Sequence, residues 1–258
     1  MRLIYPVLIA AVLAASPVVA QPAGAPVPPA PPNKVFANVN FGFQSQSQDF
    51  GQRAEFSIYD EPGSFETQHA FKGGSSFDIG GGVRVWQNLS VGLSFNQRAK
   101  HSRDVTVTAN VPSPIFTDTL RGTSGTLSGL EHTERAVHLQ ALWHVPVTVE
   151  FDVTLFAGPT FFSVEDDLVD GITTAEVGGN FSSVNLGSIG RTNQSNKATG
   201  FHVGLDTRYM FMKNVGAGAM LRYSNGSFDL ALPANNVGPA VKLDAGGLEI
   251  AAGLRFKF

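Results

Sequence analysis

The sequence predicts an all-β protein, a transmembrane antiparallel up-and-down β-barrel of eight strands, from three observations. Every second residue from Leu248 to Phe258 is apolar, which is the period of a β-strand with one apolar face. Similar segments recur along the chain, with short and long connections between them, and the amino terminus resembles a secretory signal. A final strand with an outward apolar face and a terminal aromatic residue fits a barrel closed in a lipid bilayer.

Residues 1–20 are predicted to be a signal peptide. A positively charged start precedes the apolar stretch Leu3–Ala15, and small residues lead up to a cleavage site near Ala20. Two prolines interrupt the apolar stretch, whereas a membrane helix needs about 20 consecutive apolar residues. We therefore expect export, cleavage near Ala20 and a location in the bacterial outer membrane.

Residues 21–34 are predicted to form a Pro-rich periplasmic tether, and residues 35–258 the barrel domain. Six prolines lie between Pro22 and Pro32, and such a run favours an extended conformation that packs no core. The sequence has no cysteine, so disulfides cannot stabilise the exported chain. The net charge of −3 argues against a nucleic-acid partner.

Eight segments alternate between apolar and polar residues and are predicted to be the barrel strands. They span residues 35–44, 77–86, 89–96, 134–144, 149–155, 201–211, 215–223 and 241–258.

The connections between these segments alternate in length. Those at 87–88, 145–147 and 212–214 are short, and those at 45–75, 100–131, 164–197 and 224–240 are long. Outer-membrane barrels combine tight periplasmic turns with longer external loops. The alternation therefore predicts four external loops and places Phe258 at the periplasmic rim.

Three details of the strand map have alternatives. Residues 53–59 and 65–71 are predicted to form a hairpin in the first external loop; if residues 60–63 are instead a periplasmic turn, the barrel has ten strands. Residues 104–111 could extend the third strand above the membrane. Val241, Leu243 and Ala245 are out of phase with Leu248 and the residues after it, so a β-bulge is expected at Gly246-Gly247.

Aromatic residues are expected to form two girdles where lipid headgroups meet hydrocarbon. The periplasmic girdle would contain Phe36, Trp86, Trp143, Phe211, Phe256 and Phe258, and the outer girdle Phe43, Phe95, Phe161, Phe162 and Tyr223.

The chain resembles the small outer-membrane β-barrel family of OmpA/OmpX type in Gram-negative bacteria. The resemblance lies in the pattern of residues 35–258 and in the tail Gly253-Leu254-Arg255-Phe256-Lys257-Phe258. The tail is similar to the Gly-x-x-aromatic-x-aromatic signal read by the barrel-assembly machinery, which implies that role for Gly253, Phe256 and Phe258. Ala251 stands where that signal usually has a polar residue.

The interior of the predicted barrel carries charged residues of both signs. Eight strands enclose a space that side chains can just fill, so these charges are expected to pair with one another as a plug. A narrow conduit through the network is the alternative. The predicted lumen residues are Asp78, Arg84, Arg98, Glu134, Glu150, Asp152, Asp206, Arg208, Arg222, Glu249, Arg255 and Lys257.

A basic cluster of Arg98, Lys100 and Arg103 follows the third strand, at the level where lipopolysaccharide phosphates would lie. Contact with lipopolysaccharide is one interpretation, and a solvated basic patch is the other. Residues 101–104 and 131–134 combine histidine with carboxylates or serine, as a rim enzyme would require, but no catalytic motif surrounds them. We expect no metal, no cofactor and no enzymatic activity.

The predicted function is a structural or surface-interaction role through the external loops, with an unknown external ligand. The expected partners are outer-membrane lipid and lipopolysaccharide, and the barrel-assembly machinery during biogenesis. A narrow, porin-like channel for small or hydrophobic solutes is the alternative, and a rim-located hydrolase or lipid-modifying enzyme comes third.

Overall fold

The computed structural model describes residues 34–46, 48–71, 73–99 and 101–258, and these residues form antiparallel strands without a helix. The predicted signal peptide and all but the last residue of the predicted tether lie outside the described residues. Across the described part of the chain, no helix has the length and apolar character needed to cross a membrane. The strands are β1 (Val35–Ser45), β2 (Gln48–Ile58), β3 (Glu61–Phe71), β4 (Gly74–Trp86), β5 (Leu89–Arg98), β6 (His101–Pro112), β7 (Leu120–Pro146), β8 (Phe151–Val177), β9 (Ser183–Met210), β10 (Val215–Asp229) and β11 (Lys242–Lys257).

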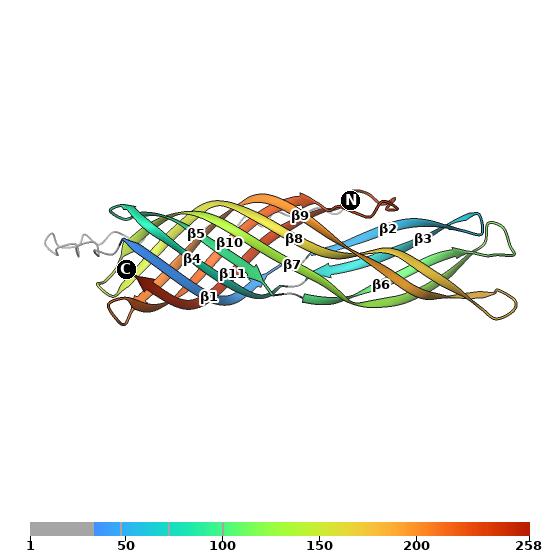
Figure 1. The fold of residues 1–258 in the computed structure, drawn as a ribbon, viewed down its shortest axis with the longest axis horizontal. Coiled ribbons are helices and arrows are strands. Elements are labelled where there is room, and N and C mark those ends of the chain that lie inside the picture. Colours follow the sequence, from blue (N-terminus) through green and yellow to red (C-terminus); the bar gives the residue numbers. More distant parts are fainter. Residues whose placement is uncertain (1–33, 47, 72, 100) are drawn as a thin grey trace, which may run out of the picture.

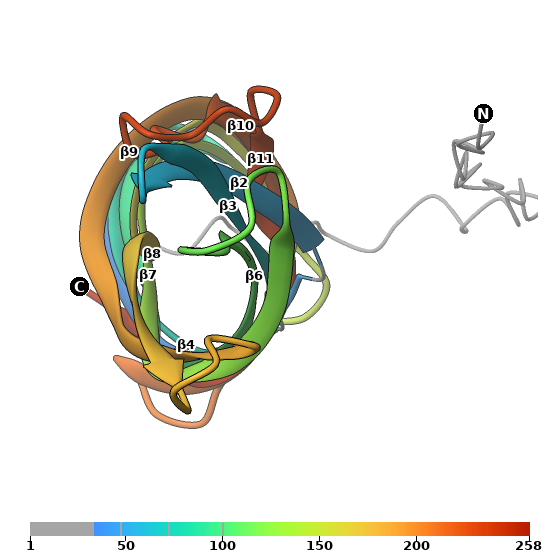
Figure 2. The ribbon, with the colours of Figure 1, turned by 90° about the vertical axis from the view of Figure 1, so that its right-hand side faces the viewer.

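Eight of these strands close into a ring, which we call the membrane ring (Figures 1 and 2). Neighbours around it are β1, β11, β10, β9, β8, β7, β5 and β4, and β4 pairs again with β1. The ladder between the first and last strands runs from Phe36–Lys257 to Ser45–Leu248. The eight-strand prediction is therefore confirmed, and the ten-strand alternative is wrong.

The three short connections lie at the end of the ring that carries the carboxyl terminus (Figure 1). They are residues 87–88, 147–150 and 211–214. The second turn is longer than expected, because β8 begins at Phe151 and not at residue 149. The Thr148 hydroxyl accepts a hydrogen bond from the Phe151 amide at 3.0 Å, which stabilises this turn.

Most of the predicted external loops are strands. Residues 120–133 of β7, 163–177 of β8 and 183–199 of β9 continue beyond the ring, and β2, β3 and β6 pair beside them; we call this region the outer sheet. The hairpin of β2 and β3 confirms the prediction for the first loop. β5 and β6 pair with successive parts of β7. β6 therefore extends the third predicted strand, as expected from residues 104–111.

The side chains that point inward are mainly polar in the ring and mainly apolar in the outer sheet. On β8, Leu155 and Phe161 are exposed on the outside of the ring, and Thr154 is buried inside it. Higher on the same strand, Phe162 and Leu168 are buried inside. The ring is thus mainly polar inside, apart from a small cluster of Leu142, Phe156, Met220 and Ala251, and it is apolar outside. The outer sheet instead has the apolar interior of a water-soluble protein.

This difference explains why the bulge predicted at Gly246-Gly247 is wrong. β10 and β11 pair without a register shift, with Ser224 opposite Gly247 and Asn225 opposite Gly246. Leu243 and Ala245 are buried on the same inward face as Glu249, because the interior is apolar at their level. The apolar residues change sides while the pairing with β10 stays in register.

Two continuous apolar clusters fill the interior beyond the ring. The lower cluster, which we call the apolar plug, includes Phe162, Val164, Phe228 and Leu243. A second cluster inside the outer sheet includes Phe65, Val105, Val107 and Leu130.

The aromatic girdles are mostly as predicted, with two exceptions. Phe162 is 3% exposed and belongs to the apolar plug, and Phe36 points inward, its ring 5.6 Å from that of His144. The other girdle residues with exposed side chains are Trp86, Trp143, Phe211 and Phe258 at one level and Phe43, Phe95, Phe161 and Tyr223 at the other.

Candidate functional site

The lumen of the ring holds three groups of buried, paired charges. Near its centre, Arg222 binds Asp78 at 2.9 Å and Glu249 at 2.5 Å. Arg255 binds Asp206 at 2.5 Å, and Asn40 joins the two groups by donating to Asp78 at 3.0 Å and accepting from Arg255 at 2.6 Å. These side chains come from five neighbouring strands of the ring, β4, β1, β11, β10 and β9, and so they fix these strands to one another.

The two ends of the lumen are also cross-linked. At the carboxyl-terminal end, Asp152 binds Arg208 at 2.8 Å and Lys257 at 3.0 Å. Towards the outer sheet, Glu134 binds Arg98 at 2.5 Å and accepts a hydrogen bond from Gln44 at 2.9 Å. The charges alternate in sign, so each buried group has an opposite partner nearby.

The structure brings together most of the predicted lumen residues. Arg84 is half-buried on the inward side of β4. Glu150 does not belong to the lumen, because it is exposed in the turn before β8. The prediction began that strand two residues too early and so assigned Glu150 to an inward position. Buried network members among the predicted set are Asp78, Arg98, Glu134, Asp152, Asp206, Arg208, Arg222, Glu249, Arg255 and Lys257.

Neutral polar side chains complete the network, and the sequence prediction did not select them. Ser76 and Asn96 both donate to Glu249, at 2.7 and 2.8 Å, and Asn40 lies between two ion pairs. All three occupy inward positions of their strands. The same alternation that identified the charges could therefore have identified them.

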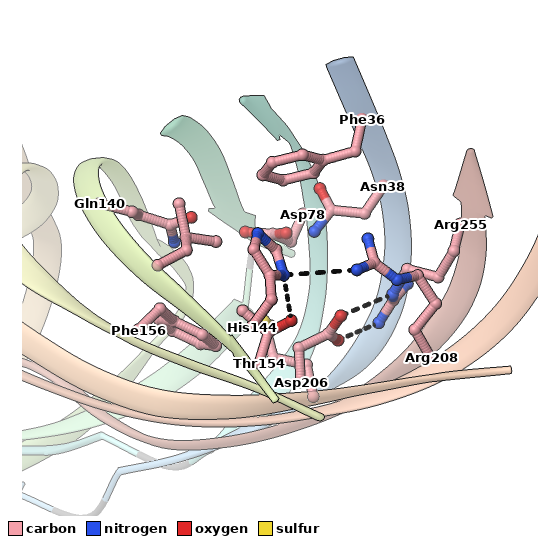
Figure 3. Close-up of a pocket in the computed structure, with 12 residues that line it drawn as sticks. Phe36, Asn38, Asp78, Gln140, His144, Thr154, Phe156, Asp206, Arg208 and Arg255 are labelled. Carbon is pink, nitrogen blue, oxygen red and sulfur yellow. Dashed lines mark hydrogen bonds and ion pairs between the residues drawn. The ribbon is translucent and has the colours of Figure 1, made fainter. Parts of the chain in front are cut away.

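The space left between these side chains is small. A cavity beside Phe36, Asn38, His144, Asp206 and Arg255 measures about 20 Å³, which is room for about one water molecule (Figure 3). The apolar plug lies above the network. Both features oppose the passage of a hydrated solute through the static lumen.

Three buried side chains form a polar chain within the ring. His138 Nδ1 and His202 Nδ1 lie 2.8 and 2.9 Å from the same Thr160 hydroxyl. A hydroxyl donates only one hydrogen, so at least one of these imidazoles must donate to it. The arrangement requires defined histidine tautomers.

Two residues of the predicted basic cluster, Arg98 and Arg103, do not lie on the outer surface. Arg98 is 1% exposed and bound to Glu134, and the Arg103 side chain is 9% exposed and lies 3.6 Å from Asp166. Lys100 is outside the described residues. The inward alternation of β5 directs Arg98 into the lumen, where a lipid phosphate on the outer surface cannot reach it.

Inside the outer sheet, His132 and Asp166 form a second buried polar group. His132 Nδ1 is 2.6 Å from Asp166 Oδ1. Burial lowers the pKa of the Arg103 guanidinium beside them, and burial also lowers the pKa of nearby His69 to about 4. The segments at 101–104 and 131–134 do pair as neighbouring strands, and His132 binds Asp166, an acid of β8 outside both segments. Within the described part of the chain, no group of three or more His, Cys, Asp or Glu could hold a metal ion.

The far end of the outer sheet is tied together by one carboxylate. Glu176 binds Arg121 at 2.7 Å and accepts a hydrogen bond from the Tyr59 hydroxyl at 2.9 Å, joining the β2–β3 turn to β7 and β8. The bond to Arg121 lowers the pKa of Glu176, and the bond to Glu176 raises the pKa of Tyr59.

Large apolar side chains are exposed beside this contact, in the loop between β6 and β7 and at the first residue of β7. Ile115, Phe116 and Leu120 are 54%, 63% and 56% exposed. We call these three residues and the Tyr59–Glu176–Arg121 contact the distal tip. This tip was not predicted from the sequence, although three apolar residues in a predicted external loop could have indicated it.

The carboxyl-terminal tail closes the ring. Phe258 donates its amide to the Val35 carbonyl at 2.8 Å, and its side chain is 64% exposed. Gly253 lies between β1 and β10, opposite Asn40 and Gly218, and Phe256 pairs with Ala37. The role of Gly253, Phe256 and Phe258 as an assembly signal stays a prediction.

An antiparallel ring of eight strands, polar inside and belted with exposed apolar side chains, is the architecture of an integral outer-membrane barrel. The family model for the outer membrane protein beta-barrel domain matches residues 9–256. The chain therefore belongs to this outer-membrane β-barrel family.

Solved structures of outer-membrane barrels resemble the chain at low sequence identity. Neisserial surface protein A (NspA) is 15% identical, with 87% of this chain and 97% of that one covered and a TM-score of 0.42. OprG from Pseudomonas aeruginosa is 9% identical, with 88% and 96% covered and a TM-score of 0.47. The outer membrane protease OmpT from Escherichia coli is 10% identical, with 88% and 97% covered and a TM-score of 0.43. No curated protein sequence matches the chain significantly.

Proposed function

We propose that this protein is a closed outer-membrane barrel whose task is surface interaction through the distal tip. The exposed apolar side chains of Ile115, Phe116 and Leu120, held at the end of a rigid outer sheet, are the observation that carries the proposal. Exposed apolar groups of this size on an otherwise polar structure are typical of contact sites. The strands of the outer sheet hold the tip away from the membrane. Because they also hold it in a fixed conformation, the tip loses little conformational entropy when it binds a partner.

The closed interior supports a role outside the lumen. Ion pairs cross-link the ring, the cavity between them takes about one water molecule, and the apolar plug covers the outer side. The same features count against the porin-like alternative. The absence of enzymatic activity remains a prediction.

Two measurements test the proposal. In planar bilayers, we expect the purified protein to give no reproducible conductance steps; discrete steps of constant size would favour the channel instead. On living cells, a photo-crosslinking amino acid at position 116 should form adducts with an external partner. The same group at exposed Ser227, on the side of the outer region, is the control, and equal adducts from both positions would contradict a tip-specific role.

A further inference from the structure

The wall of the barrel is interrupted at one place just above the apolar belt. The ladder between β1 and β11 ends at Ser45 and Leu248, but β11 continues from Gly247 back to Lys242 along β10. Within the described residues, no backbone pairing joins this stretch to the chain that follows β1. The edge of β11 therefore exposes peptide groups beside the membrane interface, where an unmet hydrogen bond is costly.

Three carboxamide side chains bridge the interruption, and the first of them is Gln44, which donates to the Gly246 carbonyl at 2.7 Å. Gln46 donates to the Asp244 carbonyl at 2.6 Å, and Gln48 accepts from the Asp244 amide at 3.0 Å. Side chains thus replace the backbone ladder at this point. They also separate the outside from a small internal cavity next to His132 and Glu134.

A pocket of about 190 Å³ lies at the bridge, lined by Gln46, Gln48, Asn225, Asp244, Gly246 and Gly247. The two glycines have φ of 101° and 128°, so other residues are disfavoured there and the pocket floor stays bare backbone. The pocket has room for roughly six water molecules, which exceeds the needs of a single ion.

The chemistry of the lining selects a ligand rich in hydroxyl groups. Asn225 and Asp244 form no side-chain hydrogen bond with the described residues, so a carboxamide and a carboxylate are available. Hydroxyl groups can donate to the carboxylate and both donate to and accept from the carboxamide. The only charge in the lining is negative, which disfavours phosphate.

The position of the pocket indicates that the ligand also has an apolar part. Tyr223 lies two residues below Asn225 on the same outward face, and it pairs with Leu248 across the strands. Tyr223 and Leu248 are 43% and 42% exposed in the apolar belt. An amphiphile could therefore place its headgroup in the pocket and its chain along these residues.

We propose that this pocket binds the glycan headgroup of a lipid-anchored glycan in the outer leaflet. The site borders the lumen network, because Gln46 accepts a hydrogen bond from Arg98 and the Gly246 amide donates to Glu134 at 3.1 Å. It is separate from the distal tip, and so it goes beyond the proposed function.

The test uses the protein in phosphatidylcholine nanodiscs, with the backbone amide signals of Asn225, Gly246 and Gly247 followed by NMR. Dodecyl maltoside, added below solubilising amounts, should shift these signals in a saturable manner. Maltose alone should bind at least about tenfold more weakly, because it lacks the apolar chain, and dodecylphosphocholine should not shift them. If maltose bound as tightly as dodecyl maltoside, the proposal that the ligand is lipid-anchored would be wrong. If dodecylphosphocholine gave equal shifts, the site would bind lipids without selecting the glycan headgroup, and the proposal would also be wrong.

Matched variants complete the test. Asp244→Ala should weaken dodecyl maltoside binding about tenfold, whereas Asp229→Ala, an exposed carboxylate higher on β10, should leave it unchanged. Asn225→Leu, which fills the pocket with an apolar group, should abolish binding. Retained binding in both Asp244→Ala and Asn225→Leu, with the barrel fold intact by circular dichroism, would overturn the proposal.

Discussion

Arg222 and Glu249 face each other across β10 and β11 and form an ion pair of 2.5 Å, with side chains only 1% and 3% exposed. The pair is the centre of the lumen network. Arg222 also binds Asp78 of β4, which lies two strands beyond β11 in the ring, so that one guanidinium connects three strands.

Removing one member of this pair should destabilise the ring strongly. Glu249→Gln leaves Arg222 with a single carboxylate partner in a buried place, and such losses cost about 3–5 kcal/mol. Urea unfolding in lipid vesicles, followed by tryptophan fluorescence, measures the change in the free energy of unfolding. Glu165→Gln is the matched control, because its pair with Arg135 is about 40% exposed and should be worth only about 0–1 kcal/mol. Equal effects of the two variants would contradict a structural role for the network.

The outer sheet should depend on its own apolar core. Phe65 is 1% exposed inside that core, and Phe65→Ala should cost about 3–5 kcal/mol through lost burial and a cavity. We expect faster protease cleavage within the outer sheet and an unchanged, protease-resistant ring. Phe116→Ala, at the exposed tip, should leave the cleavage rate at the wild-type level. Simultaneous loss of the ring would mean that the two regions unfold as one unit.

The outer sheet should also weaken in mild acid because of His69. Burial lowers the pKa of this histidine from 6.5 to about 4, so its neutral form is the one that the fold accepts. Neutral His69 makes its full contribution to the free energy of unfolding above pH 6.5. This contribution, roughly 3 kcal/mol, is lost as the pH falls from 6.5 towards 4. Protease cleavage of the outer sheet between pH 7 and pH 4 should therefore accelerate.

His69→Gln tests the cause of this pH dependence. Glutamine can keep a polar contact with Thr67, which lies 2.9 Å from the His69 ring, but does not titrate. The variant should lose most of the acceleration between pH 6.5 and pH 4. An unchanged pH profile would assign the effect to other groups.

Deletion of Phe258 should impair assembly while leaving export intact. The residue exchanges two backbone hydrogen bonds with Val35 where the first and last strands meet, and its exposed ring matches the last aromatic of the assembly signal. Fractionation should show less protein in the outer membrane and more in the periplasm. Deletion of residues 234–238, in the external connection between β10 and β11, is a control for shortening the chain away from the seam. Normal outer-membrane levels without Phe258 would refute the assignment.

The eight ring strands, their direction and their polar lumen could be predicted from the sequence, because strand alternation is a local property with a period of two. Asp78, Arg222 and Glu249 were identified this way, since each lies opposite an apolar face. The same rule failed for Glu150, because hydrogen bonds of the turn, and not alternation, decide where β8 begins.

The arrangement of the outer sheet could not be predicted from the sequence, because it depends on tertiary contacts. Sequence alternation at Leu243 and Ala245 is as regular as at Leu248 and Ile250, but it does not say which face meets lipid and which meets a protein core. That depends on whether the strand lies within the bilayer and on which distant segments pair above it. The sequence alone determined a barrel in a membrane; only the assembled strands decided that its loops become a second sheet, that Arg103 turns inward, and that a pocket opens where β1 leaves β11.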